Sequence, residues 1–230
     1  MVALVAAICL QSPSIDRSAE AALKDVFARA GSLKQAHIHM EAAYFAYVPQ
    51  RWDAFSSADF WIGDGHRFRY VDSQYRQGGG STFVSDGLVL LSDAMSDDVP
   101  VTLSLPKKTF GELNAEEPFL YFLDGPAGFD AIVDKDKGIV FVESKDTAST
   151  VIEFHSAKLS SIRVSFNPKH AFPDRIEVFN APWWAEADNP YPGQPFSRED
   201  FTLSTDKRLN FNLFRIIAPI GQALVDTRKK

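Results

Sequence analysis

Short runs of hydrophobic residues separated by turn residues recur along most of the chain, and this pattern predicts β-strands. The stretch from Ser57 to Asp93 shows it most clearly, because glycine-bearing breaks separate four short extended runs there. Asp86-Gly87 between two apolar runs is a strong hairpin signal, because both central turn residues need positive φ. The expected strands are Asp59–Ile62, Arg67–Asp72, Ser81–Ser85 and Leu88–Ser92. We therefore expect an antiparallel meander around which the rest of the chain folds.

Three segments show helical patterns instead. Apolar residues recur at helical spacing from Ser14 to Ala30, with Ser14 or Asp16 as the expected N-cap and Gly31 as the stop. Two shorter helices are expected, one over Phe119–Leu123 with its start signal at Glu116-Glu117-Pro118, and one over Phe129–Val133. We expect the long helix to pack on a sheet and the short ones to lie inside it or across its mouth.

The remaining alternating runs give the fold class. A long strand is expected at Gln35–Val48, and prolines from Pro182 to Pro195 predict a loop. Ten or more strands with few helices indicate a mainly β protein, built on one curved antiparallel sheet over residues 15–230. The later expected strands are Val99–Leu105, Ile139–Glu143, Thr150–His155, Ser160–Phe166, Arg175–Phe179, Phe201–Thr205 and Leu209–Phe214.

Composition narrows the choice of function. Of 230 residues, 45% are hydrophobic and 19 are Phe, against only 6 Tyr and 4 Trp. Phe adds apolar area without a polar group, so this bias indicates either a solid aromatic core or an apolar ligand cavity, and composition leaves the two open. The net charge of −6 argues against nucleic acid as a partner, because phosphate binding needs a basic surface.

The first residues resemble part of an export signal. Met1–Leu10 is apolar, of the length of a signal-peptide core and too short to span a bilayer. It has no positive residues ahead of it and no small-residue cleavage site behind it. We interpret residues 1–14 as a truncated signal peptide. Cys9 is the only cysteine, which excludes an internal disulfide.

No motif predicts chemistry. His37 and His39 share one strand face, but Glu41 is the only nearby ligand type on that face, so we expect solvated histidines and no metal. There is no Gly-x-Ser-x-Gly motif and no cysteine outside the presumed leader. We expect neither an enzyme nor a cofactor. A hydrolase stays as an alternative, because a catalytic triad can assemble in space from distant residues.

A family resemblance is carried by the central stretch. Phe60-Trp61, a glycine-bearing turn, Phe68-Arg69-Tyr70, and Phe83 to Gly87 leading into an apolar strand resemble the periplasmic outer-membrane lipoprotein carrier family (LolA-like). The resemblance implies an unclosed half-barrel with an N-terminal helix and short lid helices. It also implies a cavity that carries lipoprotein acyl chains across the periplasm.

One departure from the family is clear. Its carriers have an arginine and a proline in the turn before the Phe68 strand, and that arginine latches the lid. Here the turn is Gly63-Asp64-Gly65. The departure favours a divergent member that carries another lipid or hydrophobic ligand.

We therefore predict a periplasmic, monomeric, non-catalytic carrier of acyl chains or another hydrophobic ligand, with possible donor and acceptor proteins in the inner and outer membranes. The resemblance implies that Phe68 contacts a membrane partner at the cavity mouth, and the aromatic loop predicts partner contacts for Trp183 and Trp184. The alternative is a periplasmic sensing or scaffold module that acts through the Trp183-Trp184 loop. The expected cavity and lid residues are Phe60, Phe68, Tyr70, Phe83, Leu90, Phe119, Leu120 and Phe122.

Overall fold

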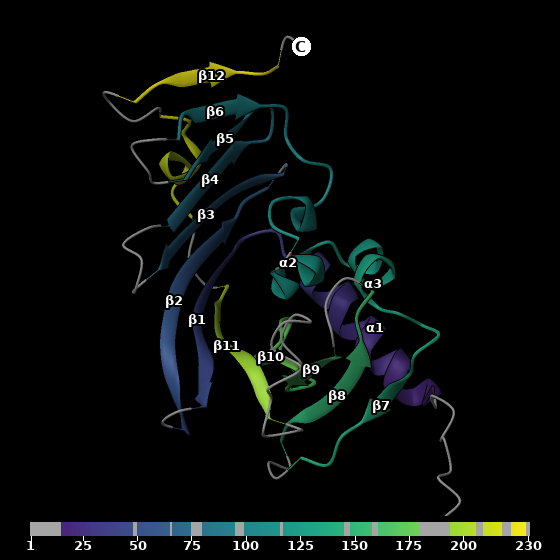
Figure 1. Cartoon of the computed structure of the whole chain (residues 1–230). Coiled ribbons are helices and arrows are strands. Elements are labelled where there is room, and N and C mark those ends of the chain that lie inside the picture. The colour runs from purple at the N-terminus through teal and green to yellow at the C-terminus, as the bar shows by residue number, and fades with distance from the viewer. Residues whose placement is uncertain are drawn as a thin grey trace, which may run out of the picture.

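A strongly curved β-sheet forms the body of the protein, and helices occupy its concave side (Figure 1). The computed structural model describes residues 15–47, 50–64, 66–74, 80–94, 99–115, 117–144, 148–157, 161–179, 194–205, 209–217 and 222–228. The expected leader, residues 1–14, lies outside the described residues, as do Trp183 and Trp184.

The described strands form one sheet in the order β12-β6-β5-β4-β3-β2-β1-β11-β10-β9-β8-β7. All neighbours are antiparallel except β12 and β6. β7 and β12 end the sheet without pairing to each other, so the barrel is open, as predicted. The strands are β1 (Ala36–Tyr47), β2 (Gln50–Ile62), β3 (Arg67–Gln74), β4 (Gly80–Asp86), β5 (Leu90–Asp93), β6 (Val101–Ser104), β7 (Ile139–Phe141), β8 (Thr150–His155), β9 (Ser161–Phe166), β10 (Arg175–Phe179), β11 (Pro195–Ser204) and β12 (Leu224–Asp226).

Helix α1 (Arg17–Gly31) confirms the predicted N-terminal helix. The Asp16 side chain caps it by accepting hydrogen bonds from the backbone N–H groups of Ser18 and Ala19. A backbone bridge between Ile15 and Ile139 joins the start of the helix to β7. The apolar stripe of the helix is buried and consists of Ala19, Leu23, Val26, Phe27 and Ala30.

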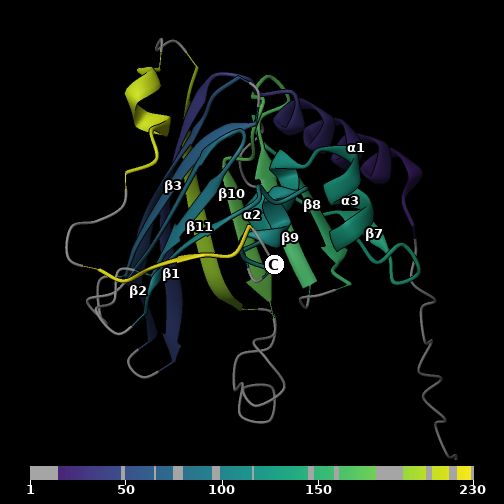
Figure 2. The same cartoon turned by 90° about the horizontal axis from the view of Figure 1, so that it is seen from above.

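Two short helices, α2 (Pro118–Leu123) and α3 (Pro126–Ile132), lie within the curve of the sheet (Figure 2). Each begins with a proline, which suits the first helical turn because no hydrogen bond needs its missing N–H. Gly125 joins them with a positive φ of 61°. A Cβ at Gly128 would lie 1.8 Å from the carbonyl oxygen of Tyr121, so only glycine permits this close approach of the two helices.

The boundaries of three strands differ from prediction. β2 begins at Gln50 and β11 at Pro195, both earlier than expected. Gly87 alone takes positive φ in the Asp86-Gly87 turn, and the Asp86 carboxylate accepts the N–H groups of Leu88 and Val89, which delays β5 to Leu90.

The prediction of a strand at Leu209–Phe214 was wrong. Phe211–Phe214 forms a 3-10 turn, η2, that contacts β3 and β4. Asn210 caps this turn by accepting the N–H of Asn212, and such local side-chain bonds stabilise a turn against an extended strand.

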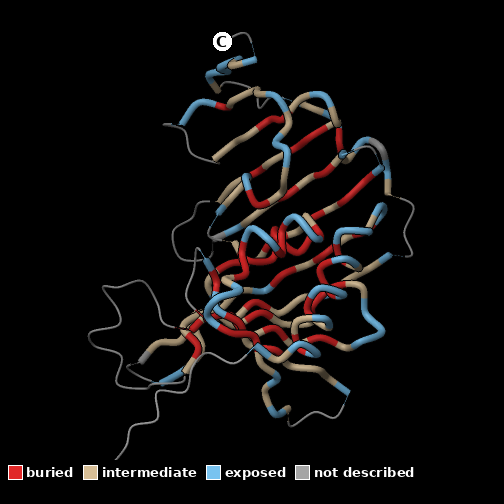
Figure 3. The backbone as a smooth tube through the Cα atoms, turned by 90° about the vertical axis from the view of Figure 1, so that its right-hand side faces the viewer, coloured by how far each residue is buried: buried red, intermediate tan, exposed pale blue. Residues whose placement is uncertain are grey.

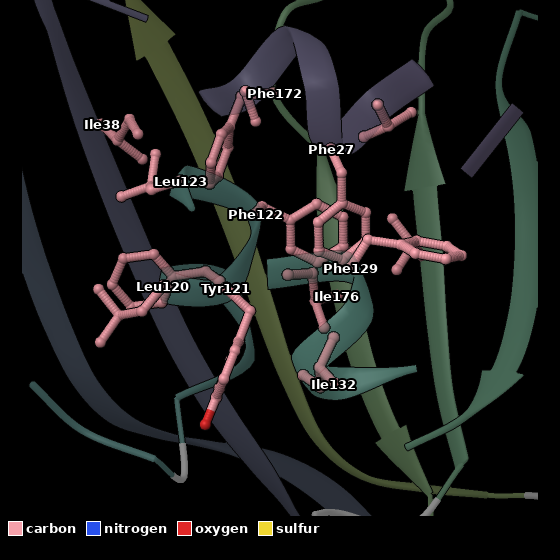
Figure 4. Packing of buried hydrophobic residues seen from close by; sticks show 14 of the residues in the cluster. Phe27, Ile38, Leu120, Tyr121, Phe122, Leu123, Phe129, Ile132, Phe172 and Ile176 are labelled. Carbon is pink, nitrogen blue, oxygen red and sulfur yellow. The ribbon is translucent and has the colours of Figure 1, made fainter. Parts of the chain in front are cut away.

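Buried residues concentrate where the helices meet the concave side of the sheet (Figure 3). Phe27 of α1 stacks on Phe122 of α2 with ring centroids 4.0 Å apart, and Phe129 of α3 meets Phe27 edge-on at 5.5 Å (Figure 4). Phe122 also contacts Phe172, in the turn before β10. One aromatic cluster therefore holds the three helices together and to the sheet.

Truncating Phe27 tests this cluster. Phe27→Ala is expected to lower the free energy of unfolding by about 3–5 kcal/mol, because Phe27 is fully buried and stacked. Urea unfolding measures the change. Leu88→Ala is the matched control: its side chain is 78% exposed, and its effect should stay within about 0.5 kcal/mol. Equal effects for the two variants would contradict the assignment.

Candidate functional site

The concave face of the sheet is the candidate site, and strand alternation decides which side chains reach it. On β2, every second residue from Ser56 to Ile62 is buried beneath the helices. Antiparallel pairing places Tyr70 opposite Phe60, and Phe68 opposite Ile62, on the same face. This face therefore carries an aromatic surface contributed by neighbouring strands.

The structure brings the eight predicted cavity and lid residues together. Phe60 stacks on Phe68 with centroids 5.7 Å apart, and Tyr70 lies 5.9 Å from Phe83 and 6.0 Å from Phe119. Phe83 is half-buried against the cluster, and the others are buried, with at most 5% of their surface exposed. They form the packed contact between sheet and helices: Phe60, Phe68, Tyr70, Phe83, Leu90, Phe119, Leu120 and Phe122.

A cavity of about 490 Å³ opens at one end of this cluster. It lies between the end of α1, the β2–β3 turn, the 106–110 segment and the α2–α3 junction. Phe68 is the one predicted site residue that lines it. Its apolar wall consists of Ala30, Leu33, Ile62, Phe68, Phe110, Leu123 and Ala127.

Asp124, at the junction of α2 and α3, fastens the helices beside this cavity. Its carboxylate accepts the backbone N–H groups of Phe110, at 2.6 Å, and Gly111, at 2.9 Å. Both belong to a 3-10 turn, η1 (Phe110–Glu112). Burial raises the pKa of Asp124, although the two N–H donors act in the opposite direction. Asp124 also lines a second cavity of about 390 Å³.

A buried carboxyl group lies elsewhere on the concave face. Glu199 of β11 is 7% exposed and sits between Ala42 of β1 and Ile176 of β10. Its Oε2 atom has no hydrogen-bond partner among the described residues. Burial raises the pKa of Glu199 well above its ordinary value, and the nearby Glu117 raises it further. Burial likewise raises the pKa of the Tyr70 hydroxyl, with Glu117 as the next cause.

Sequence reasoning missed Glu199 and Asp124. Glu199 precedes Phe201 by two residues and so shares its face, but the expected strand began only at Phe201. Asp124 follows α2 directly, and its partners lie 13 and 14 residues earlier in the chain.

The two histidines on the convex side share a carboxylate that sequence reasoning also missed. Asp59 of β2 contacts His37 Nε2 at 2.7 Å and His39 Nδ1 at 3.0 Å, while His39 Nε2 contacts Glu41 at 2.9 Å. Hydrogen bonding to Asp59 is the main cause that raises the pKa of His39. Among the described residues, no group of three His, Cys, Asp or Glu side chains has the arrangement of a metal site.

Comparison with known proteins supports the fold. No family model matches the sequence, and no curated protein matches it. An uncharacterized conserved protein from Thermus thermophilus is structurally similar, with 9% identity, 91% of this chain and 99% of that chain covered, and a TM-score of 0.53. The chain adopts an open half-barrel, and at 9% identity the likeness to the Thermus protein shows a shared fold alone.

Two weaker structural matches were also found. MucB shows 13% identity over 91% of this chain and 66% of its own, with a TM-score of 0.48, so the chain spans about two thirds of MucB's length. A LolA superfamily protein from Nitrosomonas europaea shows 9% identity over 86% of this chain and 97% of its own, with a TM-score of 0.40. Within the described part of the half-barrel, no helix is both long and apolar enough to cross a membrane.

The pH dependence of the free energy of unfolding tests whether the Glu199 carboxyl group is buried. The ordinary pKa of a Glu carboxyl group is 4.5, so the unfolded state releases this proton above about pH 4.5. The raised pKa means that the folded state keeps the proton to a higher pH. Wild-type stability should therefore fall as pH rises from about 4.5 towards the raised pKa, by at most about 1.4 kcal/mol per pH unit. Glu199→Gln should lack this slope, so its stability should rise relative to that of the wild type as the pH increases above about 4.5. Urea unfolding across this range measures it, and parallel pH profiles would contradict it.

Proposed function

We propose that this half-barrel is a non-catalytic periplasmic carrier or binder of a ligand with a hydrocarbon chain, such as the acyl chains of lipoproteins. One observation supports it above all: every residue of α2 is buried in the hollow of a sheet that is not closed. The helix occupies the space that such a ligand would take. Its six residues are Pro118, Phe119, Leu120, Tyr121, Phe122 and Leu123.

The helices α2 and α3 are suited to act as a lid. They have six and seven residues, and helices this short have little stability apart from their packing. Their contacts with the sheet are apolar, non-directional and individually weak, so another apolar group can replace them. A hydrocarbon chain entering in their place would gain about 0.8 kcal/mol for each buried methylene.

The 490 Å³ cavity offers the entry point. Its volume lies within the range of about 300–1,000 Å³ that is usual for small-molecule sites. Phe68 and Leu123 form part of both the cavity wall and the buried cluster, so a chain that enters here meets the cluster directly. Outward movement of α2 and α3 would extend the cavity along the concave face.

The lid latch would differ from the one that the family resemblance implies. The family's latch arginine is absent from the turn Gly63-Asp64-Gly65. In its place, the Asp124 carboxylate holds the α2–α3 junction to the backbone of η1 through two N–H donors. Hydrogen bonds to a charged group contribute about 1.5–3 kcal/mol, enough to favour the closed lid while still permitting it to open. Donor and acceptor proteins in the two membranes remain part of this proposal.

Direct analysis of the bound ligand tests the function. The protein is purified from a periplasmic extract without detergent, and organic-solvent extracts are analysed by mass spectrometry. We expect a co-purified lipid in near-stoichiometric amount. A protein that arrives without lipid and fails to bind the uncharged probe N-phenyl-1-naphthylamine would contradict the proposal.

Weakening the latch tests the lid. Asp124→Ala should increase the population of open molecules, so N-phenyl-1-naphthylamine should bind faster and with an apparent dissociation constant about tenfold lower. Stopped-flow fluorescence measures both quantities. Asp130→Ala is the matched control, because Asp130 lies on α3 and pairs only with exposed Lys135 among the described residues. Identical kinetics for Asp124→Ala and the control would show that Asp124 does not restrain the lid.

A further inference from the structure

The cavity has a basic rim, although the chain as a whole carries a net charge of −6. Five basic and two acidic residues contribute to its lining. The basic ones come from three separate segments, namely the end of α1, the β2–β3 turn and the segment after β6. They are Lys34, His66, Arg67, Lys107 and Lys108.

The two acids of the lining already have hydrogen-bond donors. Asp64 accepts a hydrogen bond from the side-chain amide of Gln35 at 2.8 Å, and Asp124 accepts the two backbone N–H groups of η1. Lys34, Lys107 and Lys108 are exposed, and none of them forms an ion pair with a described residue. Lys34, Lys107 and Lys108 therefore present positive charge that is not ion-paired within the described residues, and they outnumber the two carboxylates of the lining.

Directly below the rim the surface becomes apolar. Phe68 and Leu123 are each 5% exposed, and Phe110 packs edge-on against Phe68 with centroids 5.4 Å apart. Positive charge at the rim and aromatic surface at the floor together match a molecule with an anionic end and an apolar end. A free inorganic anion would leave the floor uncovered, and an amine would be repelled by the lysines.

We propose that the cavity binds a single-chain anionic amphiphile, with its phosphate or carboxylate at Lys34, Lys107 and Lys108. The first carbons of its chain lie against Phe68, Phe110 and Leu123. This inference rests on the proposed function and names the ligand class: the anionic end fixes the orientation, and the chain points towards the space that α2 fills. Charge-assisted hydrogen bonds at a partly desolvated rim supply the selectivity.

Matched amphiphiles test the inference. Dodecyl phosphate, dodecanol and inorganic phosphate are each titrated, below micellar concentration, against the protein loaded with N-phenyl-1-naphthylamine, and the displacement is measured by fluorescence. We expect dodecyl phosphate to bind about tenfold more tightly than dodecanol, with inorganic phosphate causing no displacement. The preference should shrink at high salt.

Charge variants locate the site. In the triple variant Lys34→Gln, Lys107→Gln, Lys108→Gln, the affinity for dodecyl phosphate should fall to that for dodecanol, while dodecanol binding stays as in the wild type. The matched control is Lys24→Gln, Lys137→Gln, Lys169→Gln, which removes the same charge at residues that do not line the cavity. The control should keep the tenfold preference. Circular dichroism melting curves check that both triple variants fold.

The possible failures are distinguishable. Equal binding of dodecyl phosphate and dodecanol, or a preference that survives the rim variant, overturns the anionic ligand class and leaves the carrier proposal standing. Inorganic phosphate that binds as tightly as dodecyl phosphate, in a direct calorimetric titration, would identify a free-anion site and overturn the inference. Failure of dodecanol and dodecyl phosphate alike overturns both the inference and the proposed function.

Discussion

The contact between helix α2 and the concave face of the sheet is the constraint on which the rest of the structure depends. An open sheet of this curvature has a hollow that water would otherwise fill, and the six buried residues of α2 occupy it. Phe119 meets Phe60 and Tyr70 there, while Phe122 stacks on Phe27. These contacts are strong together and weak singly, so the same surface can hold the fold closed or accept another apolar occupant.

Polar groups surround the contact between α2 and the sheet. Asp124 fastens the junction of α2 and α3 to η1, and the basic rim lies at the same end of the hollow. Glu199 is buried on the concave face between apolar neighbours, where the charged form of its carboxyl group is disfavoured. The concave face therefore combines an aromatic surface and a buried acid with a cavity at one end whose lining includes three exposed lysines.

Individual helices and strands show which parts of the fold the sequence patterns predicted. Local signals were sufficient for α1, where helical spacing and the Asp16 cap agree, for the proline that begins α2, and for the order of the strands from β2 to β5. They failed where local hydrogen bonds compete with a strand, as at η2, capped by Asn210. The starts of β2 and β11 were also missed, because at Gln50 and Pro195 no apolar alternation marks the boundary.

The sequence by itself determined the strand-rich architecture, the aromatic residues that gather on one face, and the resemblance that predicted an open half-barrel. These follow from period-two alternation and from the area that Phe removes from water. Only the tertiary structure decided that α2 fills the hollow, that Asp124 reaches η1, and that lysines from separate segments meet at one cavity. Such contacts join residues far apart in the chain, and their distances are set by sheet curvature, which local sequence patterns do not encode.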